Sequence, residues 1–315
     1  MSGSGREPGY LALLASGELA RRAEAAWARL EACDLCARGC GANRLVSAEG
    51  AGCHTADRAL VSSYGPHFGE EDPLVGRGGS GTIFFSWCNL ACRFCQNAEI
   101  SQVGEGRPVD PPELAEMMLG LQRQGCHNIN FVSPSHVVPQ ILAALPLAAR
   151  DGLRVPLVYN TGGYDALETL ALLDRVIDIY MPDMKYADAD VGRRLSGVRN
   201  YPAVNRAAVK EMHRQVGDLV MDERGVARRG LLVRHLVLPE GLAGTAEVVR
   251  FLAEEVSRDT YVNVMAQYRP HYRAYDLPPM DRPVTAEEYD AAVRLAREAG
   301  LRLDERRPRL VWGWR

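Results

Sequence analysis

Short apolar runs alternate with helical patterns along most of the chain. Six of these runs are six to eight residues long, which is typical of buried strands. Because helical segments separate them, they predict consecutive βα units whose strands pair in parallel. The runs cover residues 82–87, 128–133, 155–160, 176–181, 231–238 and 261–266.

The segments between and around these runs have helix signals of their own. Residues 10–32 are rich in Ala, Leu, Glu and Arg, and we expect one helix there. Asp110 and Glu113 predict the start of a helix after the first run, and Thr285 and Glu288 form a capping box that predicts the last helix. The chain therefore reads as an α/β protein.

Six strands predict a partial (β/α)6 TIM-like barrel, because a closed barrel needs two more strands, which the pattern does not supply. Ahead of it, residues 1–63 form an N-terminal helix and a Cys-rich, metal-binding-like extension. Residues 64–315 form the partial barrel with a C-terminal helical cap. In such folds chemistry takes place at the C-terminal ends of the strands, so the residues after each run are the first candidates for a site.

Composition narrows the class of protein. Of 315 residues, 47% are hydrophobic and 24% are charged, as in soluble globular proteins. Lys and Arg number 37 against 40 Asp and Glu, a formal charge of -3, so the balance gives no evidence for a nucleic-acid partner. No apolar run approaches the roughly 18 residues of a membrane span, and the first residues do not resemble a signal peptide. We expect a cytoplasmic protein with no membrane partner.

The eight cysteines are too sparse for a disulfide scaffold and fall into groups. In a reducing compartment such groups more often ligate metal or do redox chemistry than form structural bridges. The first group is Cys33, Cys36, Cys40 and Cys53, the second is Cys88, Cys92 and Cys95, and Cys126 stands alone.

The second group directly follows the first predicted strand, at the expected catalytic end. Three thiolates on one short loop can hold three corners of a cubane iron–sulfur cluster, which leaves one iron without a protein ligand. An open coordination position distinguishes a reactive metal site from a structural one. The alternatives are a zinc site that lacks a fourth ligand, since Cys126 lies beyond a whole helix, and three unrelated buried thiols.

The C-x3-C-x2-C spacing, with an aromatic residue before the last Cys, resembles the signature of the radical S-adenosylmethionine (SAM) superfamily. The stretch GTIFFSWCNLACRFCQNAEIS is most similar to glycyl-radical-enzyme activating proteins and to uncharacterised relatives of pyruvate formate-lyase activating enzyme. The resemblance extends over most of the chain from about residue 64. It includes the stretches NINFVSPSHVVPQIL, VYNTGGYD, DIYMPDMKY, RGLLVRHLVLP and VMAQYRP.

The resemblance implies a [4Fe–4S] cluster on Cys88, Cys92 and Cys95, with SAM chelated by the unique iron. One electron from the cluster would cleave SAM to methionine and a 5′-deoxyadenosyl radical, which abstracts hydrogen from a substrate. A flavodoxin- or ferredoxin-like single-electron donor is then the expected partner. The sequence does not identify the substrate.

The resemblance also suggests residues that bind SAM. Phe94 matches an aromatic residue near the adenine, and Asn97 matches a position that contacts SAM; loop packing and a turn are their alternatives. Ser133 stands in the loop where many members have Gly-Gly-Glu, and its hydroxyl could serve the SAM amino group. Ser135, in the same loop, suits that role or a helix N-cap.

Two further loops resemble those that hold a monovalent cation beside the SAM carboxylate in the activating enzymes. Asn160 and Thr161 match an Asp-Thr-Asn-Gly loop in which Asn replaces the acid, while Asp183 and Lys185 match an Asp-x-Lys motif. Alternation along the fifth strand sends one of Arg234 and His235 inward and the other outward, and the resemblance implies that Arg234 lies near SAM. We expect Asp183 to support SAM binding rather than fold stability; a surface ion pair is the alternative.

The first cysteine group has C-x2-C-x3-C-x12-C spacing. Cys33, Cys36, Cys40 and Cys53 can complete either tetrahedral zinc or a fully ligated iron–sulfur cluster. Four reduced thiols that pack a small subdomain are the alternative. Because such a site has no free coordination position, its role would be structural or electron relay.

Three functions are therefore open. The first is a radical SAM enzyme with an unassigned substrate. The second is an activase that installs a glycyl radical on a partner enzyme, although the insert with eight extra cysteines that some activases carry is absent. The third is a non-catalytic metal- or cluster-binding protein, against which the SAM-type motifs at the strand ends argue.

Overall fold

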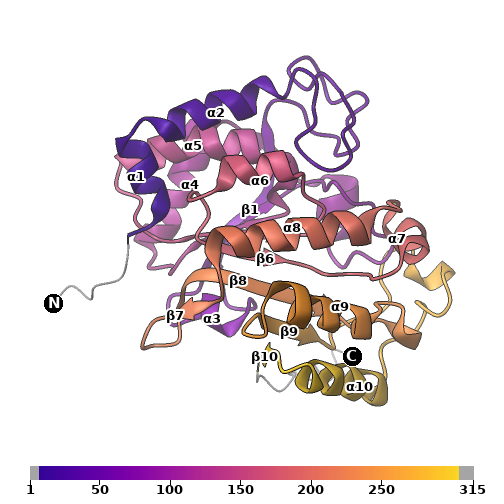
Figure 1. Ribbon diagram of the computed structural model, residues 1–315. Coiled ribbons are helices and arrows are strands. Elements are labelled where there is room, and N and C mark those ends of the chain that lie inside the picture. Colours follow the sequence, from indigo (N-terminus) through magenta and orange to yellow (C-terminus); the bar gives the residue numbers. More distant parts are fainter. Residues whose placement is uncertain (1–6, 305–315) are drawn as a thin grey trace.

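The computed structural model describes residues 7–304 and is built around one open sheet (Figure 1). The strand order is β10-β9-β8-β6-β5-β4-β2-β1-β3, and β7 pairs with β8 off this path. The strands are β1 (Ala59–His67), β2 (Ser80–Phe85), β3 (Arg107–Val109), β4 (Ile129–Val132), β5 (Leu157–Thr161), β6 (Ile179–Pro182), β7 (Val220–Met221), β8 (Ala227–Leu236), β9 (Tyr261–Met265) and β10 (Arg302–Leu303).

All six predicted strands are present as β2, β4, β5, β6, β8 and β9, and each pairs in parallel with its neighbour. β10 adds a short parallel strand at one end of the sheet, and β1 and β3 add antiparallel strands at the other. Because β10 and β3 do not pair, the sheet stays open. The predicted partial TIM-like barrel is confirmed.

The sequence did not reveal β1. Gly65 and Pro66 gave this segment the composition of a loop, yet both pair antiparallel with β2. β3 pairs only with the first three residues of β1, so the second half of β1 has a free edge, where proline is tolerated. The boundary that we placed between residues 63 and 64 falls inside this strand.

The helices are α1 (Gly9–Ala15), α2 (Glu18–Ala28), α3 (Asp72–Val75), α4 (Pro111–Arg123), α5 (Val138–Arg150), α6 (Leu167–Leu173), α7 (Ala189–Ser196), α8 (Tyr201–Val216), α9 (Thr245–Phe251) and α10 (Ala286–Glu298). The caps predicted at Asp110 and Thr285 both form. The single helix expected over residues 10–32 is wrong, because Gly17, with φ 74°, separates α1 from α2. No helix within residues 7–304 combines the length and hydrophobicity that crossing a bilayer requires.

The N-terminal helices pack on the barrel rather than apart from it. α2 lies along α5, and the Tyr10 hydroxyl of α1 donates to the Val155 carbonyl at 3.1 Å. Tyr10, Leu13 and Leu19 are buried in the same core as the outer faces of the strands. The extension is thus part of the main hydrophobic core.

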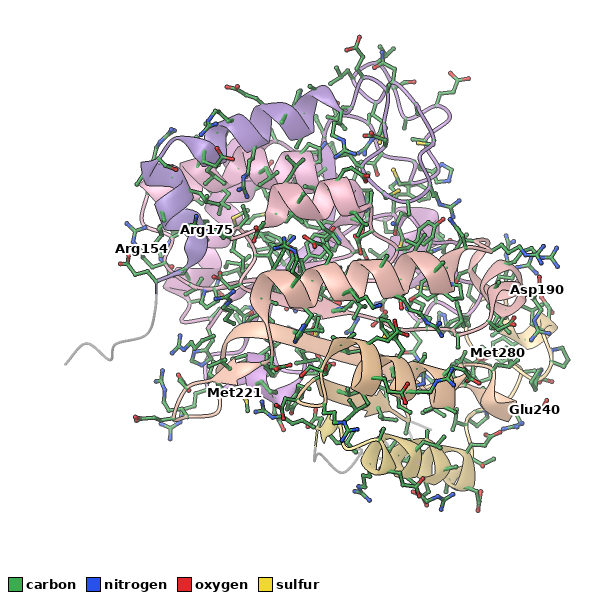
Figure 2. The ribbon with its side chains drawn as sticks, in the orientation of Figure 1. Arg154, Arg175, Asp190, Met221, Glu240 and Met280 are labelled. Atoms are coloured by element: carbon green, nitrogen blue, oxygen red, sulfur yellow. The ribbon has the colours of Figure 1, made fainter. Side chains whose placement is uncertain are left out.

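The inner faces of the strands form a second, smaller core, which we call the lumen. Val158, Ile179 and Leu232 line it, and Leu74 of α3 packs against them. In Figure 2, Arg154 and Arg175, which precede β5 and β6, lie on the left, whereas Asp190 and Glu240, which follow β6 and β8, lie on the right. The C-terminal ends of the parallel strands therefore face right, toward the catalytic end expected for this fold.

Candidate SAM and cluster site

The cysteine loop begins directly after β2. Trp87 has φ 67°, an unfavourable backbone for a bulky residue, and it turns the chain out of the strand. Cys88, Cys92 and Cys95 follow, all as free thiols. The Cys92 thiol lies 3.0 Å from the Ser196 hydroxyl.

These thiols interact electrostatically with one another. Burial raises the pKa of Cys88 to about 12, and Cys92 and Cys95 push it in the same direction. Burial also raises the pKa of Cys92, which Lys185 opposes. The three sulfurs thus form one group, with a cationic side chain beside it.

The donor set fits a cubane cluster. A cubane takes each thiolate on a different iron, and Cys88, Cys92 and Cys95 supply three free thiols on one short loop. Three cysteines then leave one iron open for a ligand.

Below the cysteine loop, four of the predicted residues form one polar network. Asp183 pairs with Lys185 at 2.5 Å and with Arg234 at 2.8 Å. The Arg234 guanidinium also donates to the Asn160 side-chain oxygen at 2.8 Å. The network joins the ends of β5, β6 and β8, which are neighbours in the sheet.

The charges of this network depend on one another. Burial acts to raise the pKa of Asp183, but Arg234 and Lys185 outweigh it and hold that pKa below its usual value. Asp183 in turn raises the pKa of both bases against the effect of burial. Both carboxylate oxygens are already bound, so a monovalent cation beside Asp183 stays a prediction.

Thr161 belongs to a different network on the outer side of the strands. Its hydroxyl donates to Asp165 at 2.7 Å and lies 3.0 Å from the Ser135 hydroxyl. Tyr159 donates to the same carboxylate at 2.9 Å. Ser135 is therefore not a helix cap, and the structure does not bring Thr161 into the network of Asp183.

The remaining predicted SAM residues have varied surroundings. Phe94 is buried and packs edge-on against Tyr186 and Tyr268. Ser133 has a left-handed backbone, φ 58°, and its N–H donates to the Asn160 carbonyl at 2.9 Å. Asn97 is exposed. Phe94 and Ser133 thus lie at the site, whereas Asn97 lies on the surface.

The lumen contains polar residues that were not predicted from the sequence. The Glu71 carboxylate accepts a hydrogen bond from Asn263 at 3.1 Å, and its other oxygen is buried without a partner. Burial raises the pKa of Glu71, which Arg234 opposes. Both polar side-chain atoms of Asn130 are also buried without a partner. Strand alternation could have found Asn130 and Asn263, but nothing in the sequence places Glu71 beside them.

Helix α8 fixes two loops of the site, and this role was not predicted from the sequence. The Asn205 amide donates to the carbonyls of Gly163 and Asp183 at 3.1 and 2.9 Å. The Tyr201 hydroxyl donates to the Gly162 carbonyl at 2.8 Å and accepts from the Lys185 N–H at 3.1 Å. The loops after β5 and β6 are therefore held in one arrangement.

Two histidines, His235 and His271, lie near the site in different positions. His235 points away from the lumen, where its ring lies 2.7 Å from the Met184 carbonyl and 2.9 Å from the Thr245 hydroxyl. The His271 ring lies 2.9 Å from the Cys95 carbonyl. His235 thus joins strand to helix, whereas His271 supports the cysteine loop.

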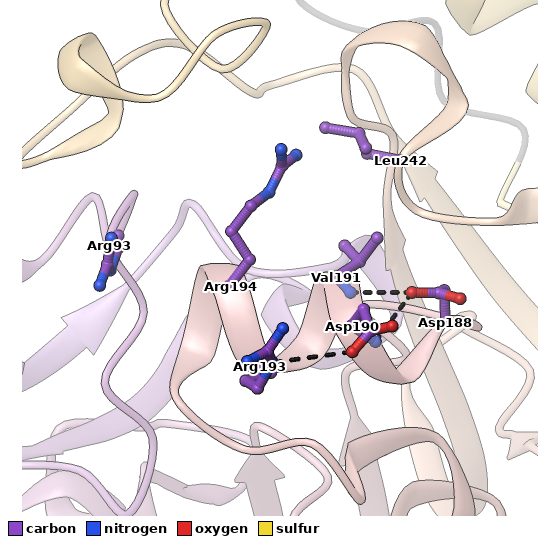
Figure 3. A pocket seen from close by; sticks show the side chains of 7 residues that line it. All are labelled: Arg93, Asp188, Asp190, Val191, Arg193, Arg194 and Leu242. Atoms are coloured by element: carbon purple, nitrogen blue, oxygen red, sulfur yellow. Dashed lines mark hydrogen bonds and ion pairs between the residues drawn. The ribbon is translucent and has the colours of Figure 1, made fainter.

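A hollow of about 540 Å³ opens on the outer rim beside the cysteine loop (Figure 3). Arg93 from that loop faces α7, whose Arg194 points into the hollow. On the α7 side, Asp190 pairs with Arg193 at 3.6 Å, while Asp188 caps the helix. The hollow is a surface feature and separate from the lumen.

The cysteines of the N-terminal group lie beyond the end of α2, in the purple loops at the upper right of Figure 1. Cys33, Cys36 and Cys53 are buried, whereas Cys40 is exposed. Burial raises the pKa of Cys36 to about 12, and Cys53 and Cys33 push it in the same direction. Cys33 and Cys53 are therefore near enough to act electrostatically on the Cys36 thiol.

Comparison with known proteins places the chain. The family model of the radical SAM superfamily matches residues 82–224. The uncharacterized protein MJ0674 of Methanocaldococcus jannaschii is 33% identical over 279 residues, which cover 86% of this chain and 76% of that protein.

Two solved structures also resemble the chain. SuiB of Streptococcus suis bound to the precursor peptide SuiA has a TM-score of 0.45 and 15% identity, over 69% of this chain and 46% of that one. The enzyme anSMEcpe with bound AdoMet has a TM-score of 0.47 and 10% identity, over 68% and 57%. The chain spans about half the length of these two structures.

Proposed function

Because the chain belongs to the radical SAM superfamily, we propose that it cleaves SAM reductively at a [4Fe–4S] cluster on Cys88, Cys92 and Cys95 and abstracts hydrogen from a substrate in the lumen. One observation carries this proposal. The Asp183 network and the cysteine loop meet at the same end of the sheet, where Lys185 interacts with both Asp183 and Cys92. Cluster ligands and groups for a zwitterionic amino acid are thus adjacent.

When bound, the cluster supplies the electron that cleaves the SAM sulfonium to methionine and a 5′-deoxyadenosyl radical. The residues of the protein bind and orient SAM. Arg234 and Lys185 offer cationic donors to a carboxylate, and Asp183 offers an acceptor to an ammonium group. Phe94, packed between tyrosines, offers an apolar wall for adenine. The lumen floor, closed by Leu74, excludes water from the reacting centre.

The unpartnered polar atoms of the lumen support a substrate site there. A buried polar atom without a hydrogen bond costs about 1–3 kcal/mol, so a ligand that binds to it removes a penalty. The free oxygen of Glu71 accepts or, when protonated, donates, and the Asn130 amide does both. We expect a substrate with a polar group that reaches below the Asp183 network.

The experiment is electron paramagnetic resonance of the reconstituted, reduced protein with and without SAM. SAM should change the cluster spectrum, because it binds the open iron. Arg234→Gln should raise the SAM concentration that is needed, by about tenfold or more. Arg193→Gln, in the exposed α7, is the matched control and should titrate like the wild type. A spectrum that SAM leaves unchanged contradicts the proposal.

The activase role is a second candidate. The rim hollow favours it, because a partner chain could lie there against Arg93 of the cysteine loop. Such a partner would show a glycyl radical signal after incubation with the reduced protein and SAM. In either role we propose a flavodoxin- or ferredoxin-like protein as the single-electron donor.

A further inference from the structure

The N-terminal cysteine segment is folded by short backbone hydrogen bonds around its cysteines. The Cys33 N–H donates to the Ala42 carbonyl at 3.0 Å, and the Gly41 N–H donates to the Cys33 carbonyl at 2.9 Å. The Gly39 N–H donates to the Cys36 carbonyl at 3.0 Å. Gly39 and Gly41 have positive φ angles of 50° and 67°, which let the chain turn tightly on both sides of Cys40.

Arg44 is the unexpected residue of this segment. Its side chain is fully buried, and its guanidinium donates to the Thr55 carbonyl at 2.7 Å, to the Ala56 carbonyl at 3.1 Å and to the Cys33 sulfur at 3.6 Å. The ion pairs of residues 7–304 include no carboxylate for Arg44.

A buried cation without a counter-charge is costly, and arginine is almost never fully buried unless it is paired. Among the groups that contact the guanidinium, the Cys33 sulfur is the one that can carry a negative charge. A metal–thiolate centre on four cysteines carries net negative charge. It would supply the counter-charge that Arg44 lacks.

The segment also lies against the SAM cluster loop at two places. The Arg38 guanidinium donates to the Asn89 carbonyl, next to Cys88. The His54 ring, next to Cys53, packs on the Trp87 ring with centroids 4.6 Å apart. Both residues that flank Cys88 are thus in contact with neighbours of the N-terminal cysteines.

We propose that Cys33, Cys36, Cys40 and Cys53 hold a second, fully ligated [4Fe–4S] cluster, that Arg44 is its buried counter-charge, and that it relays electrons to the SAM cluster. A cluster is favoured over zinc because the segment lies against the SAM cluster loop, where only a redox-active centre can relay electrons. The relay and the preference for iron rest on the proposed SAM cleavage; the four-thiolate centre and its counter-charge do not.

The relay moves electrons only. A reduced flavodoxin- or ferredoxin-type donor gives one electron to the second cluster and is itself oxidised. The second cluster then passes that electron to the SAM cluster and returns to its oxidised state. The exposed Cys40 marks the side that a protein donor can approach, and the contacts through Trp87 and Asn89 mark the side that faces the SAM cluster.

Metal analysis tests the cluster independently of SAM chemistry. The full chain with Cys88, Cys92 and Cys95 all changed to Ala is reconstituted anaerobically with iron and sulfide in the presence of zinc. We expect about four irons and four sulfides per chain. They should be lost when Cys36 and Cys53 are also changed to Ala, which leaves only two of the four thiolates, and retained on adding Cys126→Ala. Zinc without iron, or no metal in a protein with wild-type circular dichroism, overturns the proposal.

The counter-charge is tested by redox titration in the same triple variant. A positive charge stabilises the more negative, reduced cluster, so Arg44→Gln should lower its midpoint potential, and Arg44→Lys should restore part of the shift. If Arg44→Gln does not fold, Arg44→Met, which keeps the length of the side chain without its charge, takes its place. An unchanged potential in the folded, uncharged variant overturns the role of Arg44.

The relay is tested by following reduction of the Cys88 cluster by a reduced flavodoxin, with electron paramagnetic resonance as the readout. Cys36→Ala together with Cys53→Ala in the otherwise native chain should slow this reduction. An unchanged rate overturns the relay and leaves the second cluster a structural element.

Discussion

At the residue scale, the carboxylate of Asp183 is the centre of the site. Two cations, Lys185 and Arg234, share it in a largely buried setting. The sequence predicted that Asp183 supports SAM binding rather than the stability of the fold. Its partners change that expectation, because removing one member of a buried ion group leaves the others uncompensated.

Asp183→Asn should therefore destabilise the metal-free protein by about 3 kcal/mol, in addition to weakening SAM binding. Urea unfolding gives this number. The matched control is Asp190→Asn on α7, where the carboxylate is 62% exposed and pairs with Arg193 and Arg199. That change should cost less than about 1 kcal/mol. Equal losses in the two variants would refute the structural role of Asp183.

His136 gives the protein a pH dependence. It is fully buried, its ring lies 3.0 Å from the Ser86 carbonyl, and burial, assisted by Arg44, lowers its pKa to about 3. It is therefore neutral in the folded state, whereas the unfolded chain takes up a proton below about pH 6.5. The stability that it contributes is complete above about pH 6.5 and is lost as the pH falls toward 3.

Between pH 6.5 and 5, unfolding of the metal-free wild type should thus lose about 2 kcal/mol more than unfolding of His136→Gln. Denaturant unfolding at the two pH values measures the difference. Parallel pH profiles for wild type and His136→Gln would exclude His136 as the source.

At the element scale, the sequence predicted what local pattern determines. The six parallel strands were recognisable because each contains a short, largely apolar run. The caps at Asp110 and Thr285 were recognisable from their side chains. β1 was missed because Gly65 and Pro66 are typical of loops. A strand tolerates them here because this half of β1 pairs with β2 and has a free edge, and neither feature can be read from the sequence. Asp183 and Lys185 were found from a motif, whereas the Glu71–Asn263 contact depends on residues 192 positions apart.

Helix α8 carries a prediction of its own. Asn205→Ala removes the donors to the Gly163 and Asp183 carbonyls, so it should destabilise the protein by about 2 kcal/mol and weaken SAM binding. Calorimetric titration with SAM measures the second effect. Thr285→Ala at the cap of α10 is the control: it should cost about 1 kcal/mol and leave SAM affinity unchanged. If Asn205→Ala binds SAM like the wild type, α8 does not order the two loops.

At the scale of the whole molecule, one end of the barrel is closed and the candidate functional groups lie at the other, which we call the chemical end. α3 packs Leu74 into the lumen at one end, and the cysteine loop and the Asp183 network lie at the other. The N-terminal extension joins the chemical end through His54 and Arg38. This arrangement explains why the extension shares the core of the barrel: it places its cysteines beside Cys88.

Release of 5′-deoxyadenosine from SAM, under anaerobic reduction with dithionite, tests the central claim most directly. The reconstituted wild type should release it, and Cys126→Ala should release it equally. Cys92→Ala should release none, because Cys92, unlike Cys126, belongs to the loop that leaves one iron open. Release by Cys92→Ala at the wild-type rate, or no release by the wild type with its cluster intact, would contradict the account.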